Sequence, residues 1–268
     1  MDYHHYRKAL TETLAQSEVP FPAAEYQTRL DKVRQAMTEQ GLDALLLTDP
    51  ADINYLTGYH TFEVSVHACL VCTQERLVLQ VASIETGAAV VTARVDEIIG
   101  YRWENLDEII TPLADLLTPC QHIGIDGWSS GLRFGVIDAL MQAIGRERFS
   151  EAGALVDAIR IVKSPAELEM LQESARITAL GLETAIQSIR PGMTDNDIAA
   201  IGAKALLENG SEFMSLQPIV TSGHRIGVIH VNHKRRVIQP NEPVFLELGA
   251  AYQRYTAPMM RTAVTGTP

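Results

Sequence analysis

The sequence contains few cysteines, few aromatic residues and no long apolar run. Three cysteines in 268 residues cannot build a disulfide scaffold, and they fit a reducing compartment. No apolar stretch approaches the length of a membrane span, and the charged start lacks the apolar core of a signal peptide. Basic residues (22) are outnumbered by acidic ones (33), and the net charge of −11 repels a phosphate backbone. We therefore expect a cytoplasmic protein that binds neither nucleic acid nor membranes.

The patterning of apolar residues, which make up 46% of the chain, divides it into three segments. Residues 1–22 form an N-terminal arm whose end, a phenylalanine between two prolines, disfavours a helix. In residues 23–156, short apolar runs alternate with helical patterns, which predicts an α/β domain of ordinary size. In residues 157–268, two helical patterns precede several strands, which predicts an α+β domain of two helices and an antiparallel meander.

Individual elements follow from local signals. Turn residues at 73–76 separate two apolar runs and predict a hairpin. The sequence from Ser164 to Glu167 is a capping box with proline at the first helical position, and Thr194 caps a second helix. Pro112 is expected to kink or split a helix over 105–117. Strands are predicted at 44–47, 68–72, 77–81, 97–101, 122–126, 213–220, 227–231, 244–248 and 252–264.

Two polar residues in predicted strands are candidates for chemistry. His230 would share a strand face with Ile226 and Val228, a placement that is also typical of a satisfied core or surface histidine. Glu247 interrupts an apolar strand, so its carboxylate lies either on the wet face or in the interior. Burial would raise its pKa, and a raised pKa suits a general acid or base. Neither residue assigns a function by itself.

Several motifs, taken in order, resemble those of a known family. Residues 49–58 read Asp-Pro-Ala-Asp-Ile-Asn-Tyr-Leu-Thr-Gly, and 160–168 read Arg-Ile-Val-Lys-Ser-Pro-Ala-Glu-Leu. A Ser-Gly pair ends seven residues before His230, and Glu247 begins Glu-Leu-Gly. This order resembles the pita-bread enzymes: creatinase, Xaa-Pro aminopeptidase, prolidase and ectoine hydrolase. The resemblance implies a creatinase-like N-terminal domain over 23–156, followed by the first half of a pita-bread domain over 157–268.

The family's pita-bread domain consists of two similar halves, so the resemblance implies that the second half is missing. We expect a C-terminally truncated catalytic domain, and no or very weak hydrolase activity from the 268-residue chain. An inactive fragment or a dimerisation partner is therefore one alternative.

The departures from the family pattern concern its metal ligands. The family's peptidases hold two metal ions, and Glu247 stands where their first aspartate is found. Pro258 stands where their second aspartate is found, so one bridging ligand is missing. The resemblance thus implies a site without metal ligands or a cofactor, with two divalent metal ions as the alternative if the protein is peptidase-like. Met260 replaces creatinase's glutamate, which argues against creatine as the substrate.

The remaining pattern is most similar to the ectoine hydrolase branch. It implies a hydrolase of non-peptide C–N bonds in a small cyclic amidine or guanidino compound, acting as a homodimer. Glu247 would attack the amidine carbon or deprotonate water, and His230 would move the proton. Tyr255, Arg254 and His67 would orient the carboxylate of the small-molecule substrate. A metal-dependent Xaa-Pro aminopeptidase or prolidase is the alternative enzyme.

Overall fold

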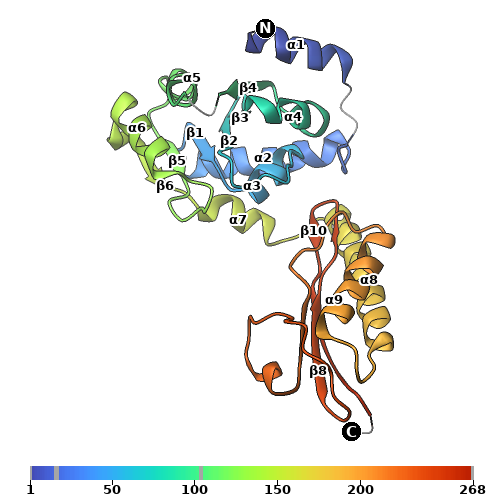
Figure 1. Ribbon diagram of the computed structural model, residues 1–268. Helices are drawn as coiled ribbons and strands as arrows, with labels where there is room; N and C mark the ends of the chain where they lie inside the picture. Colours follow the sequence, from blue (N-terminus) through green and yellow to red (C-terminus); the bar gives the residue numbers. More distant parts are fainter. Residues whose placement is uncertain (1, 15–17, 103–104, 267–268) are drawn as a thin grey trace. The chain divides into compact units, whose positions relative to one another are not determined.

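The computed structural model describes residues 2–14, 18–102 and 105–266 (Figure 1). The chain divides into two compact units, Met1–Val162 and Lys163–Pro268, which are called the N-terminal and the C-terminal unit below. This division lies after the helix α7 (Ala154–Arg160), which packs against α2 and α3 of the N-terminal unit. No helix in the described ranges has both the length and the apolar character needed to cross a membrane.

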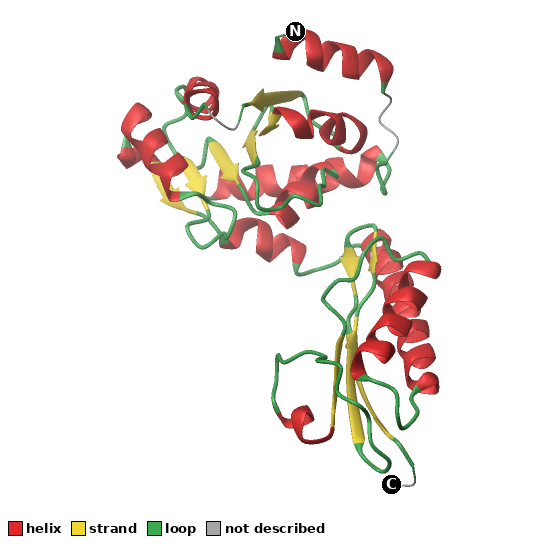
Figure 2. Ribbon diagram, in the orientation of Figure 1, coloured by secondary structure: helices red, strands yellow, loops and turns green. Residues whose placement is uncertain are grey.

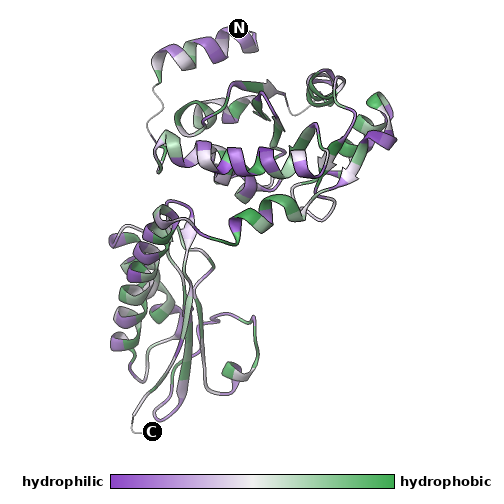
Figure 3. Ribbon diagram, turned by 180° about the vertical axis from the view of Figure 1, so that it is seen from behind, coloured by the Kyte–Doolittle hydropathy of each residue, from purple (hydrophilic) through white to green (hydrophobic). Residues whose placement is uncertain are grey.

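The N-terminal unit is a three-layer α/β/α domain around one mixed sheet of order β4-β3-β2-β1-β5-β6. The helices α2, α3, α4 and α7 contribute to the core on one sheet face, and α5 and α6 to the core on the other. In Figure 3, purple and green alternate along α2, as expected for a helix with one face on the core. Its remaining elements are α1 (Tyr3–Thr13), α2 (Ala23–Glu39), β1 (Ala44–Leu47), α3 (Pro50–Thr57), β2 (Cys69–Thr73), β3 (Leu77–Ala82), η1 (Ser83–Glu85), α4 (Thr86–Thr92), β4 (Glu97–Tyr101), α5 (Asp107–Leu117), β5 (Ile123–Ile125), α6 (Phe134–Ile144), η2 (Arg146–Arg148) and β6 (Phe149–Glu151).

The centre of this sheet is formed by β1, which pairs antiparallel with β2 and parallel with β5. All four residues of β1 are buried, so the strand is apolar on both faces. In the parallel pair, Leu45 lies opposite Gly124. A β-carbon at Gly124 would lie only 2.6 Å from Cδ2 of Leu45, so the leucine occupies the space that a larger residue would need.

The N-terminal unit departs from the sequence-based prediction in one element and settles two features that the prediction left open. Residues 50–57 form the helix α3 rather than a loop, because the amides of Ala51 and Asp52 donate to Oδ1 of Asp49, at 2.8 and 3.2 Å. The arm contains the helix α1, where Arg7 Nη1 donates to the carbonyl oxygen of Ile98 at 2.7 Å. The helix α5 runs through Pro112 without being split. The predicted hairpin is confirmed as β2 and β3.

The C-terminal unit places two helices on one face of a three-stranded antiparallel sheet of order β11-β8-β7 (Figure 2). The predicted capping box at Ser164 is present, and the predicted cap Thr194 forms a second capping box with Asp197. Buried residues of both helices, such as Ile177 and Leu206, share one core with Leu246 and Leu248 of the sheet. The elements are α8 (Pro165–Ser188), α9 (Asp195–Glu208), β7 (Ile219–Ser222), η3 (Gly223–Gly227), β8 (Pro243–Leu248), β9 (Ala251–Tyr252), β10 (Tyr255–Thr256) and β11 (Met259–Val264).

The strand predictions for this unit hold in part. The strand β8 agrees with the expected 244–248, whereas the predicted strand over 213–220 is reduced to β7 at its C-terminal end. The predicted strand over 227–231 is wrong: a 3-10 helix ends at Gly227, and a turn containing His230 follows. His230 has a φ of 62°, which a strand does not allow.

Candidate functional site

Glu247 lies near the C-terminal end of β8, on the sheet face that points away from the helices. Its strand neighbours Leu246 and Leu248 are completely buried in the core shared with α8 and α9. Because successive strand residues point to opposite faces, Glu247 and Phe245 lie on the other face, where both are half-buried. The sequence left two placements open for Glu247, and the structure shows the half-exposed one.

The surroundings of Glu247 follow from the strand register. Ile219 of β7 and Met260 of β11 lie directly opposite it on its two sides. The Glu247 carboxylate makes no hydrogen bond or ion pair with any residue that the structure describes. The oxygens of this half-buried carboxylate lie between apolar neighbours and are not occupied by any described cation, so they can contact a water molecule or a substrate.

His230 lies in the segment 223–236, which forms most of the connection from β7 to β8 and is called the histidine loop below. Its side chain is exposed, and it makes no hydrogen bond or ion pair with the described residues. The structure thus places His230 and Glu247 in the same unit, but it describes no contact between them. Their joint action in catalysis stays a prediction.

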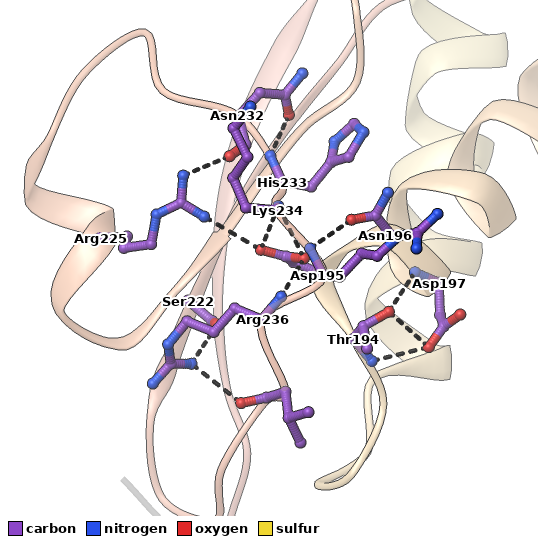
Figure 4. A network of polar contacts seen from close by, with 12 residues as sticks. Thr194, Asp195, Asn196, Asp197, Ser222, Arg225, Asn232, His233, Lys234 and Arg236 are labelled. Atoms are coloured by element: carbon purple, nitrogen blue, oxygen red, sulfur yellow. Dashed lines mark hydrogen bonds and ion pairs between the residues drawn. The ribbon is translucent and has the colours of Figure 1, made fainter.

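The histidine loop is held at both ends by one buried carboxylate, Asp195, at the start of α9 (Figure 4). Asp195 is completely buried, and the amides of Lys234 and Arg236 donate to its Oδ1 at 3.2 and 2.9 Å. From the other end of the loop, Nη1 of Arg225 lies 3.5 Å from Oδ2 of Asp195. Sequence reasoning identified the neighbouring cap Thr194 but missed Asp195, since one acidic residue in the first turn of a helix is ordinary.

The predicted substrate-binding residues Tyr255 and Arg254 lie at the β9–β10 hairpin and have protein partners. The Tyr255 hydroxyl donates to Oε1 of Glu167 at 2.9 Å, and Oε2 of this glutamate completes the capping box of α8. The guanidinium of Arg254 lies 5.0 Å from the ring centre of Phe213, and its Nε is 3.4 Å from Oε2 of Glu212. The structure gives both residues a structural role, and their contact with substrate stays a prediction.

The third predicted substrate-binding residue, His67, lies in the interior of the N-terminal unit. It is 5% exposed, and its ring centre lies 5.9 Å from that of Tyr101, whose hydroxyl donates to the His67 carbonyl oxygen. Neither ring nitrogen forms a hydrogen bond of ordinary geometry with a described residue, although the Gln80 side chain is near enough to raise the pKa of the ring slightly. Burial, with a smaller contribution from the nearby Arg133, lowers the pKa of His67 to about 4. A neutral imidazole offers no positive charge to a substrate carboxylate, so the proposed role would rest on a hydrogen bond alone.

The described residues do not provide the ligands of a metal centre. No three side chains of histidine, cysteine, aspartate or glutamate gather within the described ranges as a metal site would require. Glu247 faces Met260 across the strand pair, and Pro258 has no side-chain donor. Two hard cations need several oxygen ligands in a fixed arrangement, which this part of the chain does not assemble.

Comparison with known proteins gives two family matches that together cover most of the chain. Residues 29–162 match the Creatinase/Prolidase N-terminal domain, and residues 169–268 match Metallopeptidase family M24. The second match contradicts the prediction of a function without a cofactor, because the matched family is one of metallopeptidases. That prediction rested on two positions, Glu247 and Pro258, where the family's peptidases have aspartate ligands. Two positions do not define the ligand set of a whole metal site.

Individual relatives agree with these matches. The ectoine hydrolase of Halomonas elongata is 26% identical over 95% of this chain and 69% of its own. The Xaa-Pro dipeptidase of Pyrococcus furiosus is 23% identical over 90% of this chain and 65% of its own. The prolidase structure from Pyrococcus horikoshii superimposes with a TM-score of 0.77 at 24% identity, covering 90% of this chain and 66% of that one. The chain therefore spans about two thirds of the length of these relatives.

The expected creatinase-like and pita-bread architecture is confirmed by the family matches and by the solved structures with the same fold. The expected hydrolase class agrees with relatives that are themselves hydrolases and dipeptidases. The chain belongs to the creatinase and prolidase family of hydrolases, with a Creatinase/Prolidase N-terminal domain followed by sequence of Metallopeptidase family M24.

Proposed function

We propose that this protein hydrolyses a C–N bond in a small cyclic amidine or guanidino compound, as an ectoine hydrolase-like enzyme. The observation that carries the proposal is the Glu247 carboxylate, which is half-buried on the sheet face away from the helices and is held by no described cation. The similarity to the ectoine hydrolase of Halomonas elongata supports this substrate class.

The chemistry assigned to Glu247 follows from what ring opening of an amidine requires. A nucleophile adds to the amidine carbon, the bond from that carbon to one nitrogen breaks, and the departing nitrogen takes up a proton. Glu247 would supply the first step, either by direct attack or by taking a proton from the attacking water. The exposed imidazole of His230 would deliver the proton to the departing nitrogen.

Substrate positioning is assigned to Tyr255, Arg254 and His67. Arg254 fits a substrate carboxylate best among them, because a guanidinium forms strong charge-assisted hydrogen bonds with carboxylates. Its present partner Glu212 lies at 3.4 Å, so a substrate carboxylate would compete with this acidic side chain. We further propose that the protein acts as a homodimer.

The variant Glu247→Gln tests the catalytic assignment. The amide keeps the shape of the side chain but removes the proton-accepting and nucleophilic oxygen, so ring opening of ectoine, measured in a chain with both halves of the family's catalytic domain, should slow by about 10²–10⁴-fold. Glu169→Gln is the matched control, because Glu169 is exposed on α8. Product formation is followed by proton NMR, and folding by circular dichroism. Normal turnover by folded Glu247→Gln protein would show that the assignment is wrong.

Cleavage of Xaa-Pro dipeptides is the second candidate function, and the dipeptidase relatives favour it. Purified protein should be incubated in parallel with ectoine, creatine and an Xaa-Pro dipeptide, with and without added Mn²⁺. Ectoine turnover supports the proposed substrate class, whereas cleavage of the dipeptide alone would replace it with the peptidase function.

A further inference from the structure

The connection between β7 and β8 contains an exposed apolar tip held between two fixed ends. At the tip, Val228 is 55% exposed and Ile229 is 81% exposed, and His230 follows them in the left-handed backbone region. These residues contribute nothing to the buried core of the C-terminal unit. The position of His230 must therefore be set from the ends of the histidine loop.

Both ends of the loop meet at the Asp195 carboxylate. On the incoming side, Arg225 lies 3.5 Å from Oδ2 of Asp195, and its Nη2 donates to the carbonyl oxygen of Asn232 at 2.6 Å. This second contact joins the two sides of the loop directly. On the outgoing side, the amides of Lys234 and Arg236 donate to the same carboxylate.

Neighbouring contacts strengthen this arrangement. The Asp195 amide donates to the carbonyl oxygen of Arg236 at 3.0 Å, so this pair is bonded in both directions. The Arg235 amide donates to Oδ1 of Asn196 at 2.6 Å. Hydrogen bonds to a buried carboxylate are stronger than bonds between neutral groups, and a buried carboxylate without partners is costly. The carboxylate is therefore stable in the interior only while the loop is in place.

We propose that Asp195 is a positioning residue: together with Arg225, it closes the histidine loop and fixes His230 for proton transfer. This inference rests on the proposed function for the role of His230, whereas the closure of the loop is a separate property of the chain. Figure 4 shows both sides of the loop converging on the start of α9 through these side chains.

The test compares Asp195→Asn and Arg225→Gln with the control Asp197→Asn. Asp197 lies two residues further along α9, is exposed, and bonds only to Thr194 among the described residues, so its change leaves the loop contacts intact. Trypsin can cut the loop after Lys234, Arg235 and Arg236, sites that all the variants keep, and mass spectrometry identifies the cut. We expect cleavage in the loop to rise by about tenfold or more in both variants, because each loses a charge-assisted contact. The control should behave as the wild-type protein.

Two further readouts separate positioning from general destabilisation. The His230 ring signals in a ¹H–¹³C NMR spectrum, assigned with His230→Gln, should shift in Asp195→Asn and Arg225→Gln protein. With substrate, kcat should fall by about tenfold while KM changes little, because the loop acts on the proton-transfer step. Arg225→Lys keeps the positive charge and should restore part of kcat. Arg225→Gln tests the same closure if Asp195→Asn fails to fold.

Unchanged cleavage and unchanged His230 signals in folded variants would overturn the positioning role of Asp195. A loop that opens as expected, combined with full activity of His230→Gln protein, would instead overturn the catalytic role of His230. The two failures are therefore distinguishable.

Discussion

The buried His67 should make the stability of the N-terminal unit depend on pH. The pKa of His67 is about 4 in the folded protein, compared with 6.5 in the unfolded chain. Between these two pH values the unfolded chain therefore binds a proton that the folded protein does not. The stability associated with neutral His67 is fully present above about pH 6.5 and is lost as the pH falls toward 4. A difference of this size corresponds to about 3 kcal/mol in total, of which about 2 kcal/mol is lost between about pH 7.5 and pH 5.

The measurement compares wild-type protein with His67→Gln, whose side chain stays neutral at every pH. Urea unfolding followed by circular dichroism gives the free energy of unfolding, and hydrogen exchange of the β2–β3 amides reports on the N-terminal unit alone. The stability advantage of wild type over variant should shrink by about 2 kcal/mol between about pH 7.5 and pH 5. Because both proteins contain the same other titrating groups, the contributions of those groups to the pH dependence cancel in the difference. One such group is Asp52, whose pKa is raised to about 6 by burial.

His4→Gln is the control, because His4 is exposed on α1 and the same substitution there should leave the pH dependence unchanged. A stability difference between wild type and His67→Gln that is constant with pH would refute the reasoning, since it would show that the folded protein accommodates the protonated imidazole.

The remaining predictions concern backbone conformation and assembly. Gly58→Ala should destabilise the protein by about 1–2 kcal/mol or more in thermal unfolding, because Gly58 has a φ of 83° and a β-carbon there would lie 2.8 Å from the Thr92 carbonyl oxygen. Gly87→Ala in α4 meets nothing within 4 Å and should stabilise by up to about 1 kcal/mol, so equal effects of the two changes would contradict this argument. For the proposed homodimer, light scattering during size-exclusion chromatography should give twice the mass of one chain, and a monomer mass at micromolar concentration would exclude it.

The elements that the sequence predicts well depend on local signals. The β2–β3 hairpin follows from two apolar runs and a four-residue turn, and α8 from a capping box whose partners are three residues apart. The helix α3 also has local signals, Asp49 as its cap and Gly58 as its left-handed end. Its short length and its match to a family loop motif led to the wrong interpretation.

The features that the sequence does not predict depend on residues far apart in the chain. The helix α1 has no fully buried residue, and its contacts with Ile98 and Gly100 come from a strand about 90 residues away. The turn at His230 arises because Asp195 holds both ends of the loop, whereas the local sequence alternates as a strand does. For the candidate site, the sequence placed Glu247 correctly in a strand, but the absence of a cation partner could be seen only in the structure.

The burial of β1 on both faces has a consequence for how the chain selects its fold. A strand with one wet face cannot shift by one residue without exposing its apolar side chains, but β1 has no polar residue that such a shift would bury. The register of β1 must therefore be set by the sizes of the side chains that face each other across the strand pair. A shift by one residue would bring Ile123 or Ile125 against Leu45, where only the glycine at 124 leaves room. Gly124 therefore favours the correct register of β1 and β5 on steric grounds, because the registers shifted by one residue place an isoleucine where only glycine fits.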